Sequence, residues 1–95
     1  MIDRISENEE RLDNLLASIN NLEQALNDFK DKQKDLSLLK KYYGSKHWLH
    51  DKEAYEQNKI PKIKAGVLSE DAVWNLLENI DELKKEMNAI KKDLK

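Results

Sequence analysis

The stretch ISENEERLDNLLASINNLEQALNDF, from Ile5 to Phe29, determines how this chain is built. After a first step of seven residues, its apolar side chains recur at alternating steps of three and four. This spacing forms the a and d rows of a heptad repeat, which put one apolar stripe along an α-helix. The members of this stripe are Ile5, Leu12, Leu15, Ile19, Leu22, Leu26 and Phe29. They predict a helix that packs against other helices.

Neither Pro nor Gly interrupts the chain around this stretch, so we expect one helix over about residues 3–41. Beyond Phe29 the stripe weakens, because Gln33 takes an a position. A polar residue there either fixes the register with a neighbouring helix or faces a loosely packed end of the molecule.

Gly44 is expected to end this helix in a left-handed conformation, and Ser45 to cap a short helix over about residues 46–57. Pro61 then excludes a continuous helix, so residues 58–68 are expected to form an irregular connector. Four apolar side chains of the connector should turn inward: Ile60, Ile63, Val67 and Leu68.

Ser69 is the expected N-cap of a last helix over about residues 70–94. This helix has a second heptad stripe, formed by Val73, Leu76, Ile80, Leu83, Met87, Ile90 and Leu94. We predict an all-α fold in a single domain, residues 1–95. The two long helices form an antiparallel, coiled-coil-like hairpin, in which Leu22 lies in the core, and the short helix and connector make a capping head.

The two long helices differ in length, which leaves part of the first one uncovered. The last helix reaches along about 25 residues of the first, so that about 14 residues, or roughly 21 Å, extend beyond it. Exposed apolar seams usually mark a binding partner. We therefore expect an interface formed by Ile2, Ile5, Leu12 and Leu15. A second copy of the chain, as a dimer, is the favoured occupant, and a foreign helix is the other.

Composition and charge exclude several protein classes. The 95 residues include no Cys, which excludes disulfide scaffolds and thiolate metal sites, and their net charge of −2 gives no general attraction to nucleic acid or membranes. No apolar run approaches the roughly 20 residues that span a bilayer. We expect a cytoplasmic protein without cofactors and without a membrane partner.

Aromatic residues gather around the two chain reversals, with lysines nearby. This candidate head surface comprises Tyr42, Tyr43, Trp48, Trp74, Lys40 and Lys41. Aromatic rings beside lysines can stack on bases and bind phosphates, which makes a nucleic-acid-binding accessory protein the alternative function. The other interpretation is a structural cap, and Trp74 favours it because the short helix or connector could cover this ring.

Catalysis is the function that the sequence supports least. His47 and His50 are three residues apart but lack further ligands at suitable spacing, so we expect surface histidines rather than a metal site. Asp51, Glu53 and Glu56 are expected to be solvated charges. We therefore predict that the chain is not an enzyme.

Two sequence blocks resemble a known family. Tyr42-Tyr43-Gly44-Ser45 with Trp48-Leu49, and Gly66 to Ala72 with Asn75-Leu76-Leu77, resemble the bacterial domain-of-unknown-function 4298 family, as does Arg4 to Asp13 at the start. The resemblance implies a small, all-helical bacterial protein and brings no catalytic residues to this chain. From the residues themselves we predict a helical protein–protein interaction module that self-associates through its N-terminal stripe.

Overall fold

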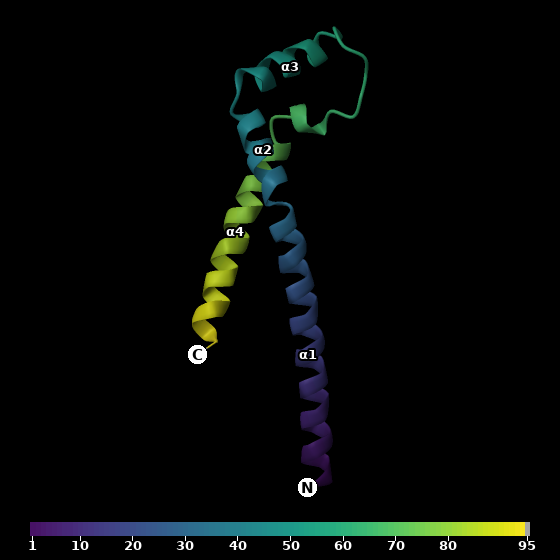
Figure 1. Cartoon of the computed structure of the whole chain (residues 1–95), viewed down its shortest axis with the longest axis vertical. Helices are drawn as coiled ribbons and strands as arrows, with labels where there is room; N and C mark the ends of the chain where they lie inside the picture. Colours follow the sequence, from purple (N-terminus) through teal and green to yellow (C-terminus); the bar gives the residue numbers. More distant parts are fainter. Residues whose placement is uncertain (95) are drawn as a thin grey trace. The chain divides into compact units, whose positions relative to one another are not determined.

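The computed structural model describes residues 1–94, so Lys95, the last residue of the predicted domain, lies outside the described residues. Over residues 1–94 the chain is helical and contains no strand, which confirms the predicted all-α class. The elements are α1 (Ile2–Asp31), α2 (Gln33–Tyr43), α3 (Lys46–Glu56), the 3-10 helix η1 (Gly66–Leu68) and α4 (Ala72–Asp93) (Figure 1). They fall into two compact units, one ending at Leu39 and the other beginning at Lys40.

The predicted uninterrupted helix over residues 3–41 is wrong, because a turn at Lys32 separates α1 from α2. The backbone oxygen of Phe29 accepts the Lys32 amide at 3.1 Å and the side-chain amide of Gln33 at 3.1 Å. A side chain that competes for a helical carbonyl, together with a bond to the third preceding residue, disturbs the regular α-helical ladder. Gln33, rather than Pro or Gly, thus marks the break.

The apolar stripe from Ile5 to Phe29 lies on α1 and is open to solvent; it is named the α1 stripe. None of the residues of α1 is buried, and the seven side chains of the stripe are 43–64% exposed. Leu22, which we expected in the core, is 52% exposed. An amphipathic helix gains most of its stability from packing its apolar face, and the stripe is the apolar face of α1.

The turn from α2 to α3 depends on Ser45. Its hydroxyl donates to the Tyr42 carbonyl oxygen at 2.6 Å and accepts the Trp48 amide at 3.4 Å, so the predicted N-cap of α3 is confirmed. Gly44 does not have a positive φ, so the expected left-handed end of the preceding helix is wrong. The Gly44 amide instead donates to the Lys40 carbonyl oxygen, and the chain reverses through the hydrogen bonds of Ser45.

The left-handed residue lies at the other end of α3. Asn58 has φ 57°, its amide donates to the Tyr55 carbonyl oxygen at 3.1 Å, and the Lys59 amide donates to that of Ala54 at 2.9 Å. This pair of bonds is the Schellman motif, which satisfies the last carbonyl groups of a helix. Asn tolerates positive φ better than most residues, which explains why it can hold this position.

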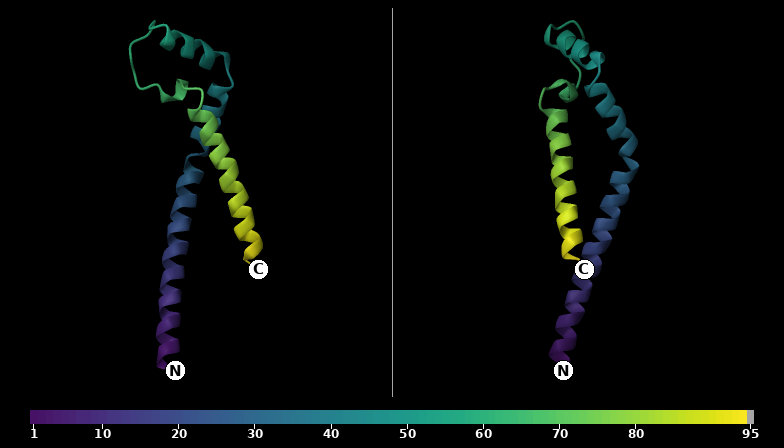
Figure 2. Two further views of the ribbon diagram at one scale, coloured as in Figure 1. Left: turned by 180° about the vertical axis from the view of Figure 1, so that it is seen from behind. Right: turned by 90° about the vertical axis from the view of Figure 1, so that its left-hand side faces the viewer.

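The connector returns the chain from α3 to α4, and η1 lies beside α3 (Figures 1 and 2). η1 contacts both α3 and α4, and the two buried residues among those described, Leu68 and Val73, lie at this junction. Ile63 is 63% exposed, contrary to the expected inward orientation, because residues 59–65 have no regular structure that packs it inward.

The start of α4 is two residues later than expected. The Ser69 hydroxyl accepts the Ala72 amide at 3.1 Å, but the regular helical ladder begins with the bond from the Asn75 amide to the Asp71 carbonyl oxygen. Ser69 therefore does satisfy an amide of the first turn, as an N-cap does, while Glu70 and Asp71 form a turn that leads into α4.

Candidate functional site

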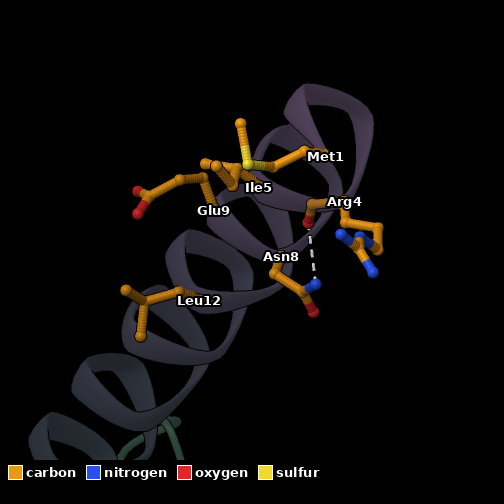
Figure 3. A pocket seen from close by; sticks show the side chains of 6 residues that line it. All are labelled: Met1, Arg4, Ile5, Asn8, Glu9 and Leu12. Atoms are coloured by element: carbon orange, nitrogen blue, oxygen red, sulfur yellow. Dashed lines mark hydrogen bonds between the residues drawn. The ribbon is translucent and has the colours of Figure 1, made fainter.

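The first candidate site is the N-terminal face of α1. All four residues of the predicted interface, Ile2, Ile5, Leu12 and Leu15, lie on this helix and are exposed. A shallow, open hollow on its first turns is lined by Met1, Arg4, Ile5, Asn8, Glu9 and Leu12 (Figure 3). Such a hollow on one helix is open to solvent and is not an enclosed ligand pocket.

Asn8 occupies the d position that interrupts the apolar row between Ile5 and Leu12. Its side-chain amide donates to the Arg4 carbonyl oxygen at 2.7 Å (Figure 3), and its side-chain oxygen accepts Arg11 Nη1 at 3.2 Å. Its polar groups are thus partly satisfied within α1, which lowers the cost of placing Asn8 in a helix–helix interface.

The second candidate site is the aromatic cluster of the head. Trp48 lies at its centre: its indole nitrogen donates to the Val67 carbonyl oxygen at 2.9 Å, and its ring meets Tyr43 edge to face with centroids 5.1 Å apart. Lys52 Nζ lies 5.6 Å from the centroid of the same ring. These contacts link α2, α3 and η1, so Trp48 joins three elements of the second unit.

Tyr42 and Asp51 form the second link between α2 and α3. The Tyr42 hydroxyl donates to Asp51 Oδ2 at 2.7 Å. This bond is the main reason that the pKa of Tyr42 rises to about 12, and it lowers the pKa of Asp51. A phenol with so high a pKa keeps its proton at neutral pH, so it serves here as a hydrogen-bond donor.

Lys52 connects α3 to the segment before α4. Its ammonium group lies 2.8 Å from Glu70 Oε1 and 3.6 Å from Glu56 Oε1. The hydrogen bond with Glu70 is the main cause of the raised pKa of Lys52 and of the lowered pKa of Glu70. Lys52 thus links α3 to Glu70 across the head, and its ammonium group contacts two carboxylates and the face of Trp48.

Trp74 does not join the aromatic cluster. We expected α3 or the connector to cover this ring, but it is 54% exposed on α4. Lys40 and Lys41 are exposed at the end of α2, as are Lys59, Lys62 and Lys64 of the connector. Of the candidate head surface, Tyr42, Tyr43 and Trp48 are partly buried in contacts with other parts of the fold, while Trp74 and the lysines face solvent.

Neither a metal centre nor a membrane-spanning helix is found among residues 1–94. No three His, Asp or Glu side chains of this range converge as ligands for an ion. His47 and His50 are both exposed, and His50 Nδ1 lies 3.5 Å from Asp51 Oδ1. No helix of the same range combines the length and the apolar character needed to cross a bilayer.

Sequence reasoning missed the two charged residues that hold the head together. Asp51 was expected to be solvated, but it is half-buried against Tyr42, and Lys52 is mostly covered although a lysine is usually exposed. The spacing of four residues between Trp48 and Lys52 on one helix face was the available signal. The Val67 carbonyl group could not have been found, since backbone acceptors leave no mark in a sequence.

Comparison with known proteins identifies one family. A family model described as a domain of unknown function (DUF4298) matches residues 5–90, which is nearly the whole chain. No curated protein and no solved structure is significantly similar to the chain.

Proposed function

We propose that this chain, which belongs to the family described as a domain of unknown function (DUF4298), is a non-enzymatic helical interaction module that self-associates through α1. The observation that carries the proposal is the α1 stripe, whose seven apolar side chains are 43–64% exposed along one face. Contiguous apolar surface of this kind usually marks a place where another protein binds.

The heptad spacing of the stripe favours a helix as the occupant of this face. Side chains at a and d positions insert between four residues of a facing helix, so an α-helical partner can cover every member of the stripe in turn. The same patch is present on each copy of the chain, so one surface serves both sides of a homodimer. A helix of another protein is the second possible occupant.

We infer further that α4 packs antiparallel to the later part of the first long helical segment. Residues 70–82 contain five acidic and no basic residues, whereas residues 84–92 contain four lysines and one glutamate. Along residues 1–41 the acidic residues concentrate at the start and the lysines at the end. Antiparallel packing brings unlike charges together along the hairpin. In this arrangement α4 lies beside the stripe, along the flanking positions of Ala25 and Leu39. The partner then has access to Ile2, Ile5, Leu12, Leu15 and the rest of the stripe. We place this function in the cytoplasm, which the lack of Cys permits.

Sedimentation velocity of paired variants tests the proposal. Leu12→Asp plus Ile19→Asp places two carboxylates in the stripe, and we expect association to weaken at least tenfold, since a charge in an apolar interface costs several kcal/mol. Asn14→Asp plus Asn21→Asp is the matched control, because it adds the same two charges at the same spacing off the stripe. A wild-type chain that sediments as a monomer at micromolar concentration with α1 folded would contradict self-association.

Nucleic-acid binding is the second candidate function, and one observation favours it. Residues 57–68 contain three exposed lysines and no acidic residue, and the exposed Trp74 lies in the same unit. Fluorescence anisotropy with a labelled single strand at low salt distinguishes this function. Binding that weakens steeply as salt rises supports it, and no binding at low salt excludes it.

A further inference from the structure

The first 41 residues carry a strong charge polarity along their helices. Residues 3–13 contain five acidic residues and two arginines, whereas residues 30–41 contain five lysines and two aspartates. α1 spans most of this distance, so the acidic group and the lysine group sit near opposite ends of one stripe. Two parallel copies would place like groups side by side, while two antiparallel copies place unlike groups together.

We propose that the occupant of the α1 stripe is a second copy of this chain that runs antiparallel to the first. The acidic turns around Glu9 then lie beside the lysine group of the second copy, and the same contact is repeated by symmetry at the other end. This inference rests on the proposed self-association and adds the orientation and the register of the two copies.

The polar residues of the stripe define the register. Asn8 and Gln33 are the two polar side chains in the a and d rows between residues 5 and 36. If Asn8 faces Gln33 of the second copy, every layer between them is apolar. Leu12 then meets Phe29, and Ile19 meets Leu22.

Other antiparallel registers set Asn8 or Gln33 against an apolar side chain. In the chosen register the e position Glu9 also lies beside Lys30 of the second copy, where residues flanking the seam form interhelical ion pairs. Both polar residues satisfy part of their hydrogen-bonding capacity within their own chain, through the Arg4 and Phe29 carbonyl oxygens. They can therefore share one layer while some of their polar groups keep hydrogen-bond partners.

Disulfide cross-linking tests the orientation, and the absence of Cys from the chain removes any background. The two single variants are Asn8→Cys and Gln33→Cys. In an antiparallel dimer neither variant cross-links to itself, because the two copies of each cysteine lie at opposite ends, but an equal mixture gives a covalent heterodimer under mild oxidation. Cysteines 25 residues apart along a helix are separated by roughly 37 Å, far beyond the reach of a disulfide.

The possible outcomes separate this inference from the function on which it rests. Efficient cross-linking of Asn8→Cys to itself, without a covalent heterodimer in the mixture, shows parallel copies and overturns the inference while self-association stands. A sample that sediments as a monomer and cross-links in no combination overturns both.

Charge reversal provides a second test that needs no oxidation. Lys32 is paired with Asp28 at 3.0 Å, so the residues to change are Lys30→Glu and Lys34→Glu together. In the antiparallel dimer these changes set acidic groups against each other at both ends, and we expect association to weaken at least tenfold. Lys62→Glu plus Lys64→Glu, on the connector, is the matched control and should leave association unchanged.

Circular dichroism of each variant first confirms that the helices are retained. If the variant with Lys30→Glu and Lys34→Glu associates as strongly as the wild type, the antiparallel arrangement is contradicted. In a parallel pair the changed residues face their own copies, so like charges face each other before and after the change and association is largely unaffected.

Discussion

At the scale of single residues, Tyr42 and Asp51 show how one hydrogen bond sets the protonation of both partners. The phenol donates to the carboxylate at 2.7 Å, and the negative charge it faces holds the Tyr42 proton in place. The pKa of Tyr42 rises from 10.0 to about 12, and that of Asp51 falls. Both shifts favour the same state, a neutral phenol beside an ionised carboxylate, from weakly acidic to mildly alkaline pH.

Asp51→Asn should return the pKa of Tyr42 toward its ordinary value of 10.0. The substitution removes the charge that opposes ionisation of the phenol while keeping a hydrogen-bond acceptor of similar shape. An absorbance titration of phenolate formation measures this, and Tyr42→Phe identifies which of the three tyrosines in the chain is responsible. If Asp51→Asn leaves the late-titrating tyrosine unchanged, another group holds that proton.

The same pair predicts how the stability of the head depends on pH. Because the folded pKa of Tyr42 is raised, its contribution is fully present below pH 10 and is lost as pH rises toward about 12, since the unfolded chain releases the proton first. The lowered pKa of Asp51 has the opposite consequence at low pH. Its contribution is present above the unfolded pKa and disappears as pH falls through the lowered, folded pKa.

At the scale of elements, the left-handed residue was expected after α2, but it lies after α3. Gly44 follows α2 without a positive φ, whereas Asn58 follows α3 with φ 57°. A Cβ atom added at Gly44 meets the Lys40 carbonyl oxygen at 3.5 Å, an ordinary van der Waals distance. The two positions therefore respond differently to the same new side chain.

Asn58→Ala should destabilise the head by about 1 kcal/mol. The left-handed conformation is unfavourable for any residue with a Cβ atom, and Ala lacks the polar side chain by which Asn offsets that cost. Gly44→Ala should be neutral, or stabilising by up to about 1 kcal/mol, because it restricts the unfolded chain. Urea denaturation followed by tryptophan fluorescence measures both changes. Equal losses of stability would contradict the assignment of the left-handed position to Asn58.

The sequence was informative wherever a structural role depends on residue type and spacing. Ser45 and Ser69 were identified because each hydroxyl stands three residues before an amide that it can accept. The stripes were identified because heptad spacing needs only apolar residues at fixed steps. The sequence failed at Lys32, where the break depends on which acceptor the Gln33 side chain chooses, and at Trp74, where exposure depends on the course of the connector. Such outcomes follow from tertiary geometry, which no single residue encodes.

The two candidate sites also differ in how far the sequence predicts them. The apolar face of α1 follows from its own stripe and could be predicted, since each residue needs only a place on one helix, but the exposure of Leu22 could not be predicted. The cluster around Trp48 requires residues up to nineteen positions apart, Trp48 and Val67 among them, to meet across a chain reversal. The sequence indicated that aromatic residues gather there but could not show that Lys52 and Glu70 close the cluster.

At the scale of the whole molecule, the two units can be followed by separate signals. Both tryptophans, Trp48 and Trp74, lie in the unit that begins at Lys40, and residues 1–39 contain neither Trp nor Tyr. Tryptophan fluorescence therefore reports on the head, whereas far-ultraviolet circular dichroism includes the 30 residues of α1. If α1 is stabilised by a second copy, only part of the unfolding should depend on protein concentration.

We expect the thermal transition seen by circular dichroism to move to higher temperature as protein concentration rises, because mass action stabilises whatever the second copy covers. The fluorescence transition should stay in place, because the contacts of Trp48 are made within one chain. In Leu12→Asp plus Ile19→Asp, the dichroism transition should fall and lose its dependence on concentration, while the fluorescence transition is retained. A wild-type chain in which both probes report one transition, independent of concentration, would mean that the α1 stripe is covered by the chain's own helices.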